Sequence, residues 1–343
     1  MADGRAPLVS VVIPAYNCAA TLQVLLESLA ASRFTDFEVV VVDDGSVDRT
    51  VETAERWRAR VVRQPVNQGP GAARNRGALE ARGDFVVFLD SDTAVFPDTL
   101  AEIVRALQEP GQDVVLGLYD KEPLNRGFFP TYYALLKHYA QSATQITHYN
   151  VFASHCAAVR RRVFLESGGF RPFPKGMDIE NEELGRRLQA GGCNIVFDPR
   201  VRVRHHFAGF KKLVYIFVQR TYWWMRIFLV SRRFEQSLTT RSFGVGTVAG
   251  ALALPAALAA VTLAHGPARL QLLGAAAILL GVFLGAYAGF LGLCRREKGW
   301  FFALRAASAC WLFTLLVSFG AVAGLAGILT GPKPGPSGAG EAV

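Results

Sequence analysis

The chain has 343 residues and a formal net charge of +9. This length allows a globular domain and a further segment. The five cysteines are scattered without a C-x-x-C pair, so their spacing supports neither a zinc site nor a disulfide framework. The net charge would fit nucleic-acid binding in a soluble protein, but much of the basic excess lies near the apolar C-terminal part. We therefore expect an anionic membrane surface as a partner, and no nucleic acid.

Apolar runs alternate with helical patterns in the N-terminal part of the chain. Strands are expected at 8–13, 37–42, 60–64, 85–89 and 113–118, with helices between them at about 21–31, 48–60, 71–82 and 97–108. Strands separated by helices indicate a mostly parallel, doubly wound, Rossmann-like α/β sheet with both faces covered. No G-x-G-x-x-G follows the first strand, which argues against a dinucleotide-dependent oxidoreductase.

Two carboxylates, Asp90 and Asp92, directly follow the apolar run 85–89. Ligands of open α/β sheets bind beyond the carboxyl ends of the strands, so these acids are expected in the binding crevice. Two acids this close repel each other, and a cation relieves the repulsion. Oxygen ligands suit Mg²⁺ or Mn²⁺. An Asp-x-Asp alone is also common in solvated turns, and only the position on the sheet makes it a metal candidate.

Polar segments follow two other strands. The "DDGS" of 43–46 offers a carboxylate that can accept a hydrogen bond from a nucleotide base, or else it forms a turn and a helix cap. In "NQGPGAARNRG", 67–77, Gly69 and Gly71 permit close backbone approach, and Arg74 lies one turn inside the next helix. This segment is either an anion site or an ordinary glycine-rich loop.

Three apolar segments near the C-terminus are long enough to cross a bilayer, at about 243–264, 270–293 and 307–330. The basic loop "CRREKGW" separates the second from the third, whereas only "HGPAR" separates the first from the second. Basic loops stay in the cytoplasm, so we expect a multi-pass protein of the inner membrane with its N-terminal domain on the cytoplasmic side. The N-terminal sequence shows no signal-peptide pattern.

Four motifs together resemble those of the family 2 glycosyltransferases of GT-A fold. They are "VSVVIPAYN", "VVVDDGSVDRT", "NQGPGAARNRG" and "GDFVVFLDSD", in that order. Residues 152–170 resemble the family's acceptor-side segment, and 179–188 resemble its catalytic helix. The resemblance covers roughly residues 8–230. It implies that the nucleotide is held by Pro14, Tyr16, Asn17, Asp43, Asp44, Gly71, Arg74 and Asp90.

The resemblance also implies a metal site. Asp90 and Asp92 would serve the ribose and a divalent ion, Mg²⁺ or Mn²⁺, on the donor's diphosphate, and His205 would complete the ligand set. In "QRTYW", Gln219, Arg220 and Trp223 resemble residues of the Q-R-x-R-W motif that meets the diphosphate and the acceptor in membrane polysaccharide synthases. Tyr222 replaces the second arginine of that motif, which puts one charge contact in doubt. A surface histidine pair is the competing interpretation of His205 and His206.

These expectations define four segments along the chain. They are a GT-A domain at 1–208, an amphipathic interfacial helix region at 209–236, a transmembrane region at 237–331 and a disordered Pro/Gly-rich tail at 332–343. The basic and aromatic composition of 209–233 favours a membrane interface, although a linker between the domain and the first span would fit as well.

One residue departs from the family pattern. Inverting transfer needs a carboxylate that takes the acceptor's proton, and the family usually supplies an Asp after a Glu on the catalytic helix. Here Asn181 follows Glu180, and an asparagine cannot act as a base. The role then falls to Glu180, which we prefer, or to Glu182. We expect Glu183 to pair with Arg187 on the helix surface. A lipid-phosphate acceptor, which needs no base, and loss of activity are the other two explanations.

The sequence therefore predicts a membrane-bound inverting glycosyltransferase. It would move a sugar from a UDP-sugar to a membrane lipid, a lipid-linked sugar or a polysaccharide. Three spans are few for an export channel, so a processive synthase would need oligomers or membrane partners, and single transfer is preferred. The competing hypothesis is a catalytically inactive GT-A scaffold subunit of a glycan-assembly complex. Asn181 supports it, whereas the intact Asp90 and Asp92 oppose it. A nucleotidyltransferase is a weaker third interpretation.

Overall fold

The computed structural model describes residues 5–143, 151–173, 179–231, 241–262 and 265–330. The chain forms two compact units. The first consists of Met1–Arg126 and Gln141–Phe207, and the second of Gly127–Ala140 and Ala208–Val343. The chain therefore enters the second unit once, returns to the first and then leaves it again.

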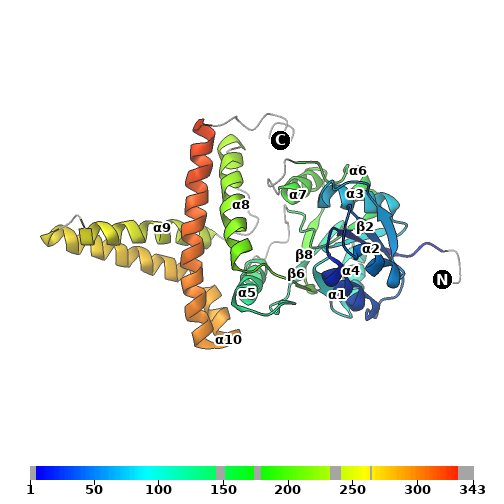
Figure 1. Ribbon diagram of the computed structural model, residues 1–343, viewed down its shortest axis with the longest axis horizontal. Coiled ribbons are helices and arrows are strands. Elements are labelled where there is room, and N and C mark those ends of the chain that lie inside the picture. The colour runs from blue at the N-terminus through cyan, green and yellow to red at the C-terminus, as the bar shows by residue number, and fades with distance from the viewer. Residues whose placement is uncertain (1–4, 144–150, 174–178, 232–240, 263–264, 331–343) are drawn as a thin grey trace. The chain divides into compact units, whose positions relative to one another are not determined.

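A single eight-stranded sheet forms the centre of the first unit (Figure 1). Its strands are β1 Val9–Ala15, β2 Phe37–Asp43, β3 Arg60–Arg63, β4 Phe85–Leu89, β5 Thr93–Val95, β6 Val114–Tyr119, β7 Cys156–Arg160 and β8 Ile195–His205. Their order across the sheet is β3-β2-β1-β4-β7-β6-β8-β5. The pairs β1–β2, β1–β4, β2–β3 and β6–β8 are parallel, whereas β7 runs antiparallel to β4 and β6, and β5 runs antiparallel to β8.

Helices cover both faces of this sheet, as predicted. They are α1 Ala19–Ala30, α2 Thr50–Arg56, α3 Pro70–Glu80, α4 Thr99–Gln108, α6 Arg161–Glu166 and α7 Glu180–Ala190. Alternate residues of each strand point to opposite faces. Val11 and Val87 pack on the side of α1, α2 and α4, and Val12 and Phe88 pack on the side of α3, α6 and α7 (Figure 1). The predicted doubly wound, mostly parallel α/β architecture is thus confirmed.

Gly83, just before the start of β4, lies close to the backbone of β1. A Cβ atom added at Gly83 would lie 2.8 Å from the backbone nitrogen of Ser10 in β1. β4 pairs with β1 on one side and with β7 on the other, and all of its residues are buried. Asp90 directly follows this strand. A rigid strand is a suitable support for a binding residue.

The second unit is helical. It contains most of α5 Phe128–Ala143, together with α8 Phe210–Ser231, α9 Arg241–Thr262 and α10 Gly266–Thr330. Gly299 interrupts α10 with non-helical dihedral angles (φ 84°, ψ 175°), so the helix turns there. Buried aromatic rings from α5, α9 and α10 form its core, and Tyr132 packs on Phe290 and Phe313 with ring centroids 5.7 Å apart in each pair.

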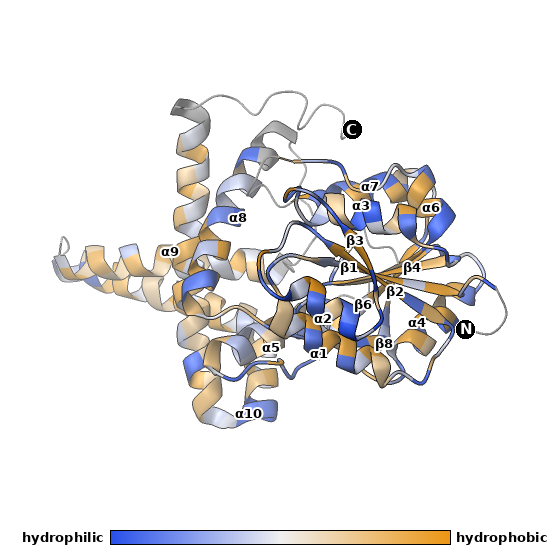
Figure 2. Cartoon of the chain, turned by 45° about the vertical axis from the view of Figure 1, so that its right-hand side comes forward, coloured by the Kyte–Doolittle hydropathy of each residue, from blue (hydrophilic) through white to orange (hydrophobic). Residues whose placement is uncertain are grey.

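Two described helices are long and apolar enough to cross a membrane, Ser242–Thr262 and Gly266–Gly327. Figure 2 shows both largely in the colours of hydrophobic residues. They are candidate membrane anchors by length and composition. The sequence predicted three separate segments, but 270–293 and 307–330 both belong to α10, on either side of Gly299. The predicted tail at 332–343 lies outside the described residues, as do 232–236 of the interfacial region.

Candidate active site

The loops after β1 and β2 hold each other through hydrogen bonds. The Asn17 side-chain oxygen accepts the Val47 N–H at 2.8 Å, and the Asn17 N–H donates to Ser46 Oγ at 3.0 Å. Asn17 has a left-handed φ of 48°, a conformation that asparagine tolerates better than most residues. Asp43 is buried and accepts the Ser46 N–H at 3.2 Å. The ring of Tyr16 is half-exposed beside them. Four predicted nucleotide residues, Pro14 at the end of β1 included, therefore lie at one edge of the sheet.

Asp44 holds the glycine-rich loop in place. Its two carboxylate oxygens accept the N–H groups of Gln68 and Gly69, each at 2.8 Å. Gly69 has a φ of 91°, which favours glycine, and α3 begins at the next residue. A Cβ atom added at Gly71 would lie 3.3 Å from Cβ of Phe170. The bonds to Asp44 explain the shape of this loop, and its predicted contact with a nucleotide stays a prediction.

Arg74 and Asp90 form a partly buried ion pair. The Nη2 of Arg74 lies 2.6 Å from Oδ1 of Asp90, and the side chain of Arg74 is only 6% exposed. The guanidinium also lies over the ring of Phe170, 5.4 Å from its centroid. Burial opposes ionisation of Asp90, but the nearby charges of Arg74 and His205 outweigh it and hold the pKa of Asp90 below its usual value. Asp90 is therefore a carboxylate near neutral pH.

Asp90, Asp92 and His205 form a group that fits a divalent cation. One ligand atom from each of the three lies within 4.8 Å of the others. The Nε2 of His205 is 3.1 Å from Oδ1 of Asp92, and its buried Nδ1 has no hydrogen-bond partner among the described residues. Two carboxylates and an imidazole are ligands that Mn²⁺ accepts, and carboxylates suit Mg²⁺. The competing interpretation of His205 as one of a surface pair does not fit, because its side chain is 15% exposed.

Strand pairing explains how His205 reaches the two acids. Asp92 is followed at once by β5, and Thr93 of β5 lies opposite His205 of β8. The backbone N–H of His206 then donates to the carbonyl of Asp92 at 2.8 Å. The short antiparallel β5–β8 pair therefore brings the last predicted ligand to the first two.

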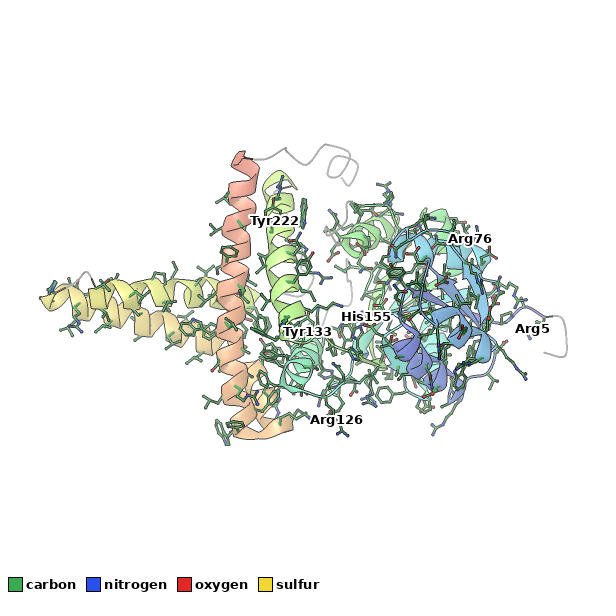
Figure 3. The ribbon with its side chains drawn as sticks, viewed as in Figure 1. Arg5, Arg76, Arg126, Tyr133, His155 and Tyr222 are labelled. Carbon is green, nitrogen blue, oxygen red and sulfur yellow. The ribbon has the colours of Figure 1, made fainter. Side chains whose placement is uncertain are left out.

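Sequence reasoning missed a set of rings beside His205. The ring centroid of Tyr119 lies 5.3 Å from that of His205, and that of Phe207 lies 4.8 Å from it. On its other side Tyr119 stacks on His155, with centroids 3.8 Å apart (His155 is labelled in Figure 3). His155 stands directly before β7 in "FASHC", and nothing in that pattern distinguishes it from a core histidine.

The first turn of α7 carries three acids and Asn181. Glu183 pairs with Arg187 at 2.8 Å and with Arg171 at 3.4 Å, which confirms the predicted Glu183–Arg187 pair. The predicted surface position of this pair is wrong for Glu183, which is buried. Glu182 is buried, whereas Glu180 is partly exposed. The backbone carbonyl of Asn181 accepts an N–H from residue 152, in the segment that leads to β7. The start of α7 is thereby tied to the chain next to the metal candidate.

The remaining predicted residues, Gln219, Arg220 and Trp223, lie on α8 in the second unit. On the same helix the hydroxyl of Tyr222 accepts a hydrogen bond from Nη1 of Arg226 at 2.6 Å (Tyr222 is labelled in Figure 3). The Arg226 guanidinium lies 5.4 Å from the ring centroids of both Tyr222 and Trp223. Tyr222, which stands where the motif has an arginine, therefore binds an arginine one turn further on.

Comparison with known proteins identifies a domain in the N-terminal half of the chain. Residues 10–168 match the model described as glycosyl transferase family 2. The chain carries a family 2 glycosyltransferase domain. Among the solved structures it resembles mannosyltransferase PcManGT from Pyrobaculum calidifontis, in complex with GDP-Man and Mn²⁺, with a TM-score of 0.53 and 21% identity over 95% of this chain and 88% of that one. This likeness confirms the predicted GT-A fold.

Three curated relatives of this glycosyltransferase domain come from bacteria. An uncharacterized glycosyltransferase of Haemophilus influenzae is 29% identical over 164 residues, 47% of this chain and 56% of the relative. Poly(ribitol-phosphate) beta-N-acetylglucosaminyltransferase TarS of Staphylococcus aureus is 40% identical over 114 residues, 31% of this chain and 20% of TarS. Succinoglycan biosynthesis protein ExoO of Rhizobium meliloti is 38% identical over 119 residues, 34% of each chain. The matches thus span about half of these relatives or less.

Proposed function

We propose that this protein is a membrane-bound, metal-dependent, inverting glycosyltransferase. Its donor is a UDP-sugar, and its acceptor is a membrane lipid, a lipid-linked sugar or a polysaccharide. The observation that carries the proposal is the group of Asp90, Asp92 and His205 beside the Arg74 ion pair, at the carboxyl edge of a family 2 domain. TarS, a sequence relative that has been solved with UDP-GlcNAc, supports the choice of donor.

In this proposal, different loops at one edge of the sheet bind different parts of the donor. Asp90, Asp92 and His205 hold Mg²⁺ or Mn²⁺, which supplies positive charge to the donor's diphosphate and to the leaving UDP. Asp44 accepts the N–H groups of Gln68 and Gly69 and so fixes the shape of the glycine-rich loop at the same edge. Tyr16 offers an exposed ring to the base. Hydrogen bonds hold the loops after β1 and β2, the glycine-rich loop and Asp90 in place, which limits the cost of binding.

Glu180 is the proposed base. It is the partly exposed acid of the first turn of α7, whereas Glu182 is buried and Glu183 is paired with two arginines. A carboxylate oxygen of Glu180 would accept the proton of the acceptor hydroxyl. The hydroxyl oxygen would bond to the anomeric carbon of the sugar as the bond from that carbon to the phosphate oxygen of UDP breaks. If Glu180→Gln keeps turnover within a few-fold of wild type, this assignment fails. A phosphate acceptor, which has no proton to give up, would then be the better hypothesis.

The second unit is proposed as the membrane part. α9 and the two parts of α10 would cross the bilayer, with the first unit and the arginines near Gly299 on the cytoplasmic side. α8 would lie at the interface, where Gln219, Arg220 and Trp223 would meet the diphosphate or the acceptor. We also propose that the GT-A domain covers residues 1–208, the interfacial helix region 209–236 and the transmembrane region 237–331.

The test is release of UDP by the full-length protein in detergent. The assay uses Mn²⁺ or Mg²⁺, a panel of UDP-sugars and GDP-mannose, with and without EDTA and a bacterial lipid extract. We expect metal-dependent release that the lipid stimulates, and its loss in Asp90→Asn and Asp92→Asn. Asp84→Asn is the matched control, because Asp84 is exposed at the opposite end of β4.

Asn181 supports a second candidate, an inactive scaffold subunit. If no donor is turned over by the wild type and Asn181→Asp restores release, the scaffold is the correct interpretation. Release of pyrophosphate in place of UDP would instead indicate a nucleotidyltransferase. Either result would overturn the proposal of an active glycosyltransferase.

A further inference from the structure

The imidazole of His205 lies beside two aromatic rings. Tyr119 meets it at 89° with centroids 5.3 Å apart, and Phe207 meets it at 42° with centroids 4.8 Å apart. Tyr119 and Phe207 also contact each other, at 5.2 Å. Perpendicular and tilted ring pairs at these distances are attractive, so they favour one orientation of the imidazole over others.

Strand register places Tyr119 beside His205. Tyr119 is the last residue of β6 and pairs with Val203 of the parallel strand β8. The next residue, Asp120, donates its N–H to the carbonyl of Val203 at 2.8 Å. His205 follows Val203 by two residues and therefore points to the same face of the sheet. The contact between Tyr119 and His205 is thus set by backbone pairing.

His155 holds the other face of Tyr119. The two rings stack at 13° with centroids 3.8 Å apart, and His155 is 6% exposed. Its Nε2 lies 3.2 Å from the carbonyl oxygen of Gly117 in β6. Because a carbonyl oxygen can only accept a hydrogen bond, Nε2 must carry a proton. This bond fixes the plane of the His155 ring, and so the surface on which Tyr119 lies.

Gly117 permits this arrangement. A Cβ atom added at Gly117 would lie 2.6 Å from Sγ of Cys156 and 2.8 Å from Val201. Only a residue without a side chain therefore lets the start of β7 approach β6 this closely. The same approach brings His155 within reach of the Gly117 carbonyl. A continuous series of contacts runs from Gly117 through His155 and Tyr119 to His205.

We infer that Tyr119, braced by His155, is a positioning residue for the metal ligand His205. The Tyr119 ring holds the imidazole so that its Nε2 faces Asp92, at 3.1 Å. This inference rests on the proposed metal site. It adds that the affinity of the site depends on a ring that is not one of the three proposed ligands. Residues that orient a ligand in this way commonly change metal affinity by about 10- to 100-fold when they are replaced.

Mn²⁺ binding to the full-length protein, followed by electron paramagnetic resonance, tests the inference without turnover. Tyr119→Leu removes the ring and should weaken Mn²⁺ binding by about 10-fold or more. Tyr119→Phe keeps the ring and should bind within about 2-fold of wild type, because the phenyl face and edge make the same contacts. Tyr133→Leu, in the second unit, is the matched control and should leave the affinity unchanged.

Binding of UDP in EDTA separates positioning from general damage. Tyr119→Leu should bind UDP without metal as wild type does, and should lose only the gain in affinity that Mn²⁺ brings. Equal Mn²⁺ affinity in Tyr119→Leu and wild type would overturn the inference alone, and so would equal losses in Tyr119→Leu and Tyr119→Phe. Absence of Mn²⁺ binding in the wild type would overturn the proposed metal site and the inference with it.

Discussion

The guanidinium of Arg74 and the carboxylate of Asp90 lie 2.6 Å apart, and this pair connects two sequence motifs that are not adjacent in the chain. Arg74 comes from the glycine-rich segment that opens α3, and Asp90 from the end of β4. The pair keeps Asp90 ionised and orients it toward Asp92 and His205. The predicted anion-binding segment and the proposed metal ligands therefore lie next to each other.

Replacement of Arg74 by Ala should lower metal-dependent turnover by about 100-fold or more, the scale expected when a preorganised charge is removed from an active site. The cause is the loss of the cation that holds Asp90 in place. Arg76→Ala is the control, because Arg76 is half-exposed and pairs with Glu80 on the helix surface. Similar rates of UDP release in the two variants would contradict the role given to Arg74.

Glu38 should make the first unit sensitive to acid. Burial raises the pKa of Glu38, but hydrogen bonds from Arg82 and Ser10 outweigh it, so the pKa in the folded state lies below the ordinary value of 4.5. A lowered folded-state pKa means that Glu38 contributes stability above pH 4.5 and that this contribution is lost as pH falls through its folded pKa. Its side chain is 8% exposed, but Arg82 is 55% exposed, so we expect only about 1–2 kcal/mol.

Hydrogen exchange of β2 in Glu38→Gln and wild type measures this contribution. The variant should exchange faster near neutral pH, and the difference should shrink once pH falls below 4.5. Glu52→Gln, an exposed residue in the first turn of α2, is the matched control and should follow wild type. A difference that grows on acidification would refute the sign of the shift.

The packing of α8 on α10 depends on glycines. A Cβ atom added at Gly324 would lie 2.5 Å from the carbonyl oxygen of Tyr222, and one added at Gly320 would lie 2.6 Å from that of Val218. Gly324→Ala must therefore separate the two helices, at a cost of about 1–3 kcal/mol. Gly274→Ala, with open space around it, should be neutral or should stabilise α10 by up to about 1 kcal/mol. Thermal unfolding in detergent compares the two, and equal midpoints would argue against close contact.

Phe88 should be among the most sensitive core positions of the first unit. It is fully buried in β4, and its ring contacts Phe152, Phe164 and Phe170 at centroid distances of 5.8, 4.9 and 6.0 Å. Phe88→Ala should cost about 3–5 kcal/mol through the cavity it leaves. Val47→Ala, at an exposed loop position, should change stability by less than about 0.5 kcal/mol. Both are measurable as shifts in thermal unfolding, and a small shift for Phe88→Ala would mean that the phenylalanine cluster closes the cavity.

Much of the first unit was predictable because β1, β2 and β4 are largely buried and form near-continuous apolar runs in the sequence. The positions of Asp43, Asp90 and Asp92 at the ends of these strands followed from that reading. Sequence periodicity could not place β5 or β8. β5 is three residues long, and β8 alternates valine with arginine because only one of its faces is covered. His205 was assigned through a resemblance, and β5–β8 pairing is the physical reason for its position.

The support of His205 was not predictable. Tyr119 and His155 become neighbours only through the register of β6 with β7 and β8, which involves residues distant in the chain. The sequence also did not predict that residues 127–140 belong to the second unit. Its tyrosines and phenylalanines suit a soluble core as well as a helical bundle, and their partners on α10 lie beyond residue 282.

The excursion of Gly127–Ala140 into the second unit has a practical consequence for dissecting the protein. A truncation after Phe207 would keep α5 but remove the residues that bury Tyr132 and Leu135, each at most 1% exposed. Such a fragment would display an apolar helix in water and would be prone to self-association. A soluble catalytic fragment would need the residues 127–140 replaced by a short polar connection between Arg126 and Gln141, because the residues of the two units alternate along the chain.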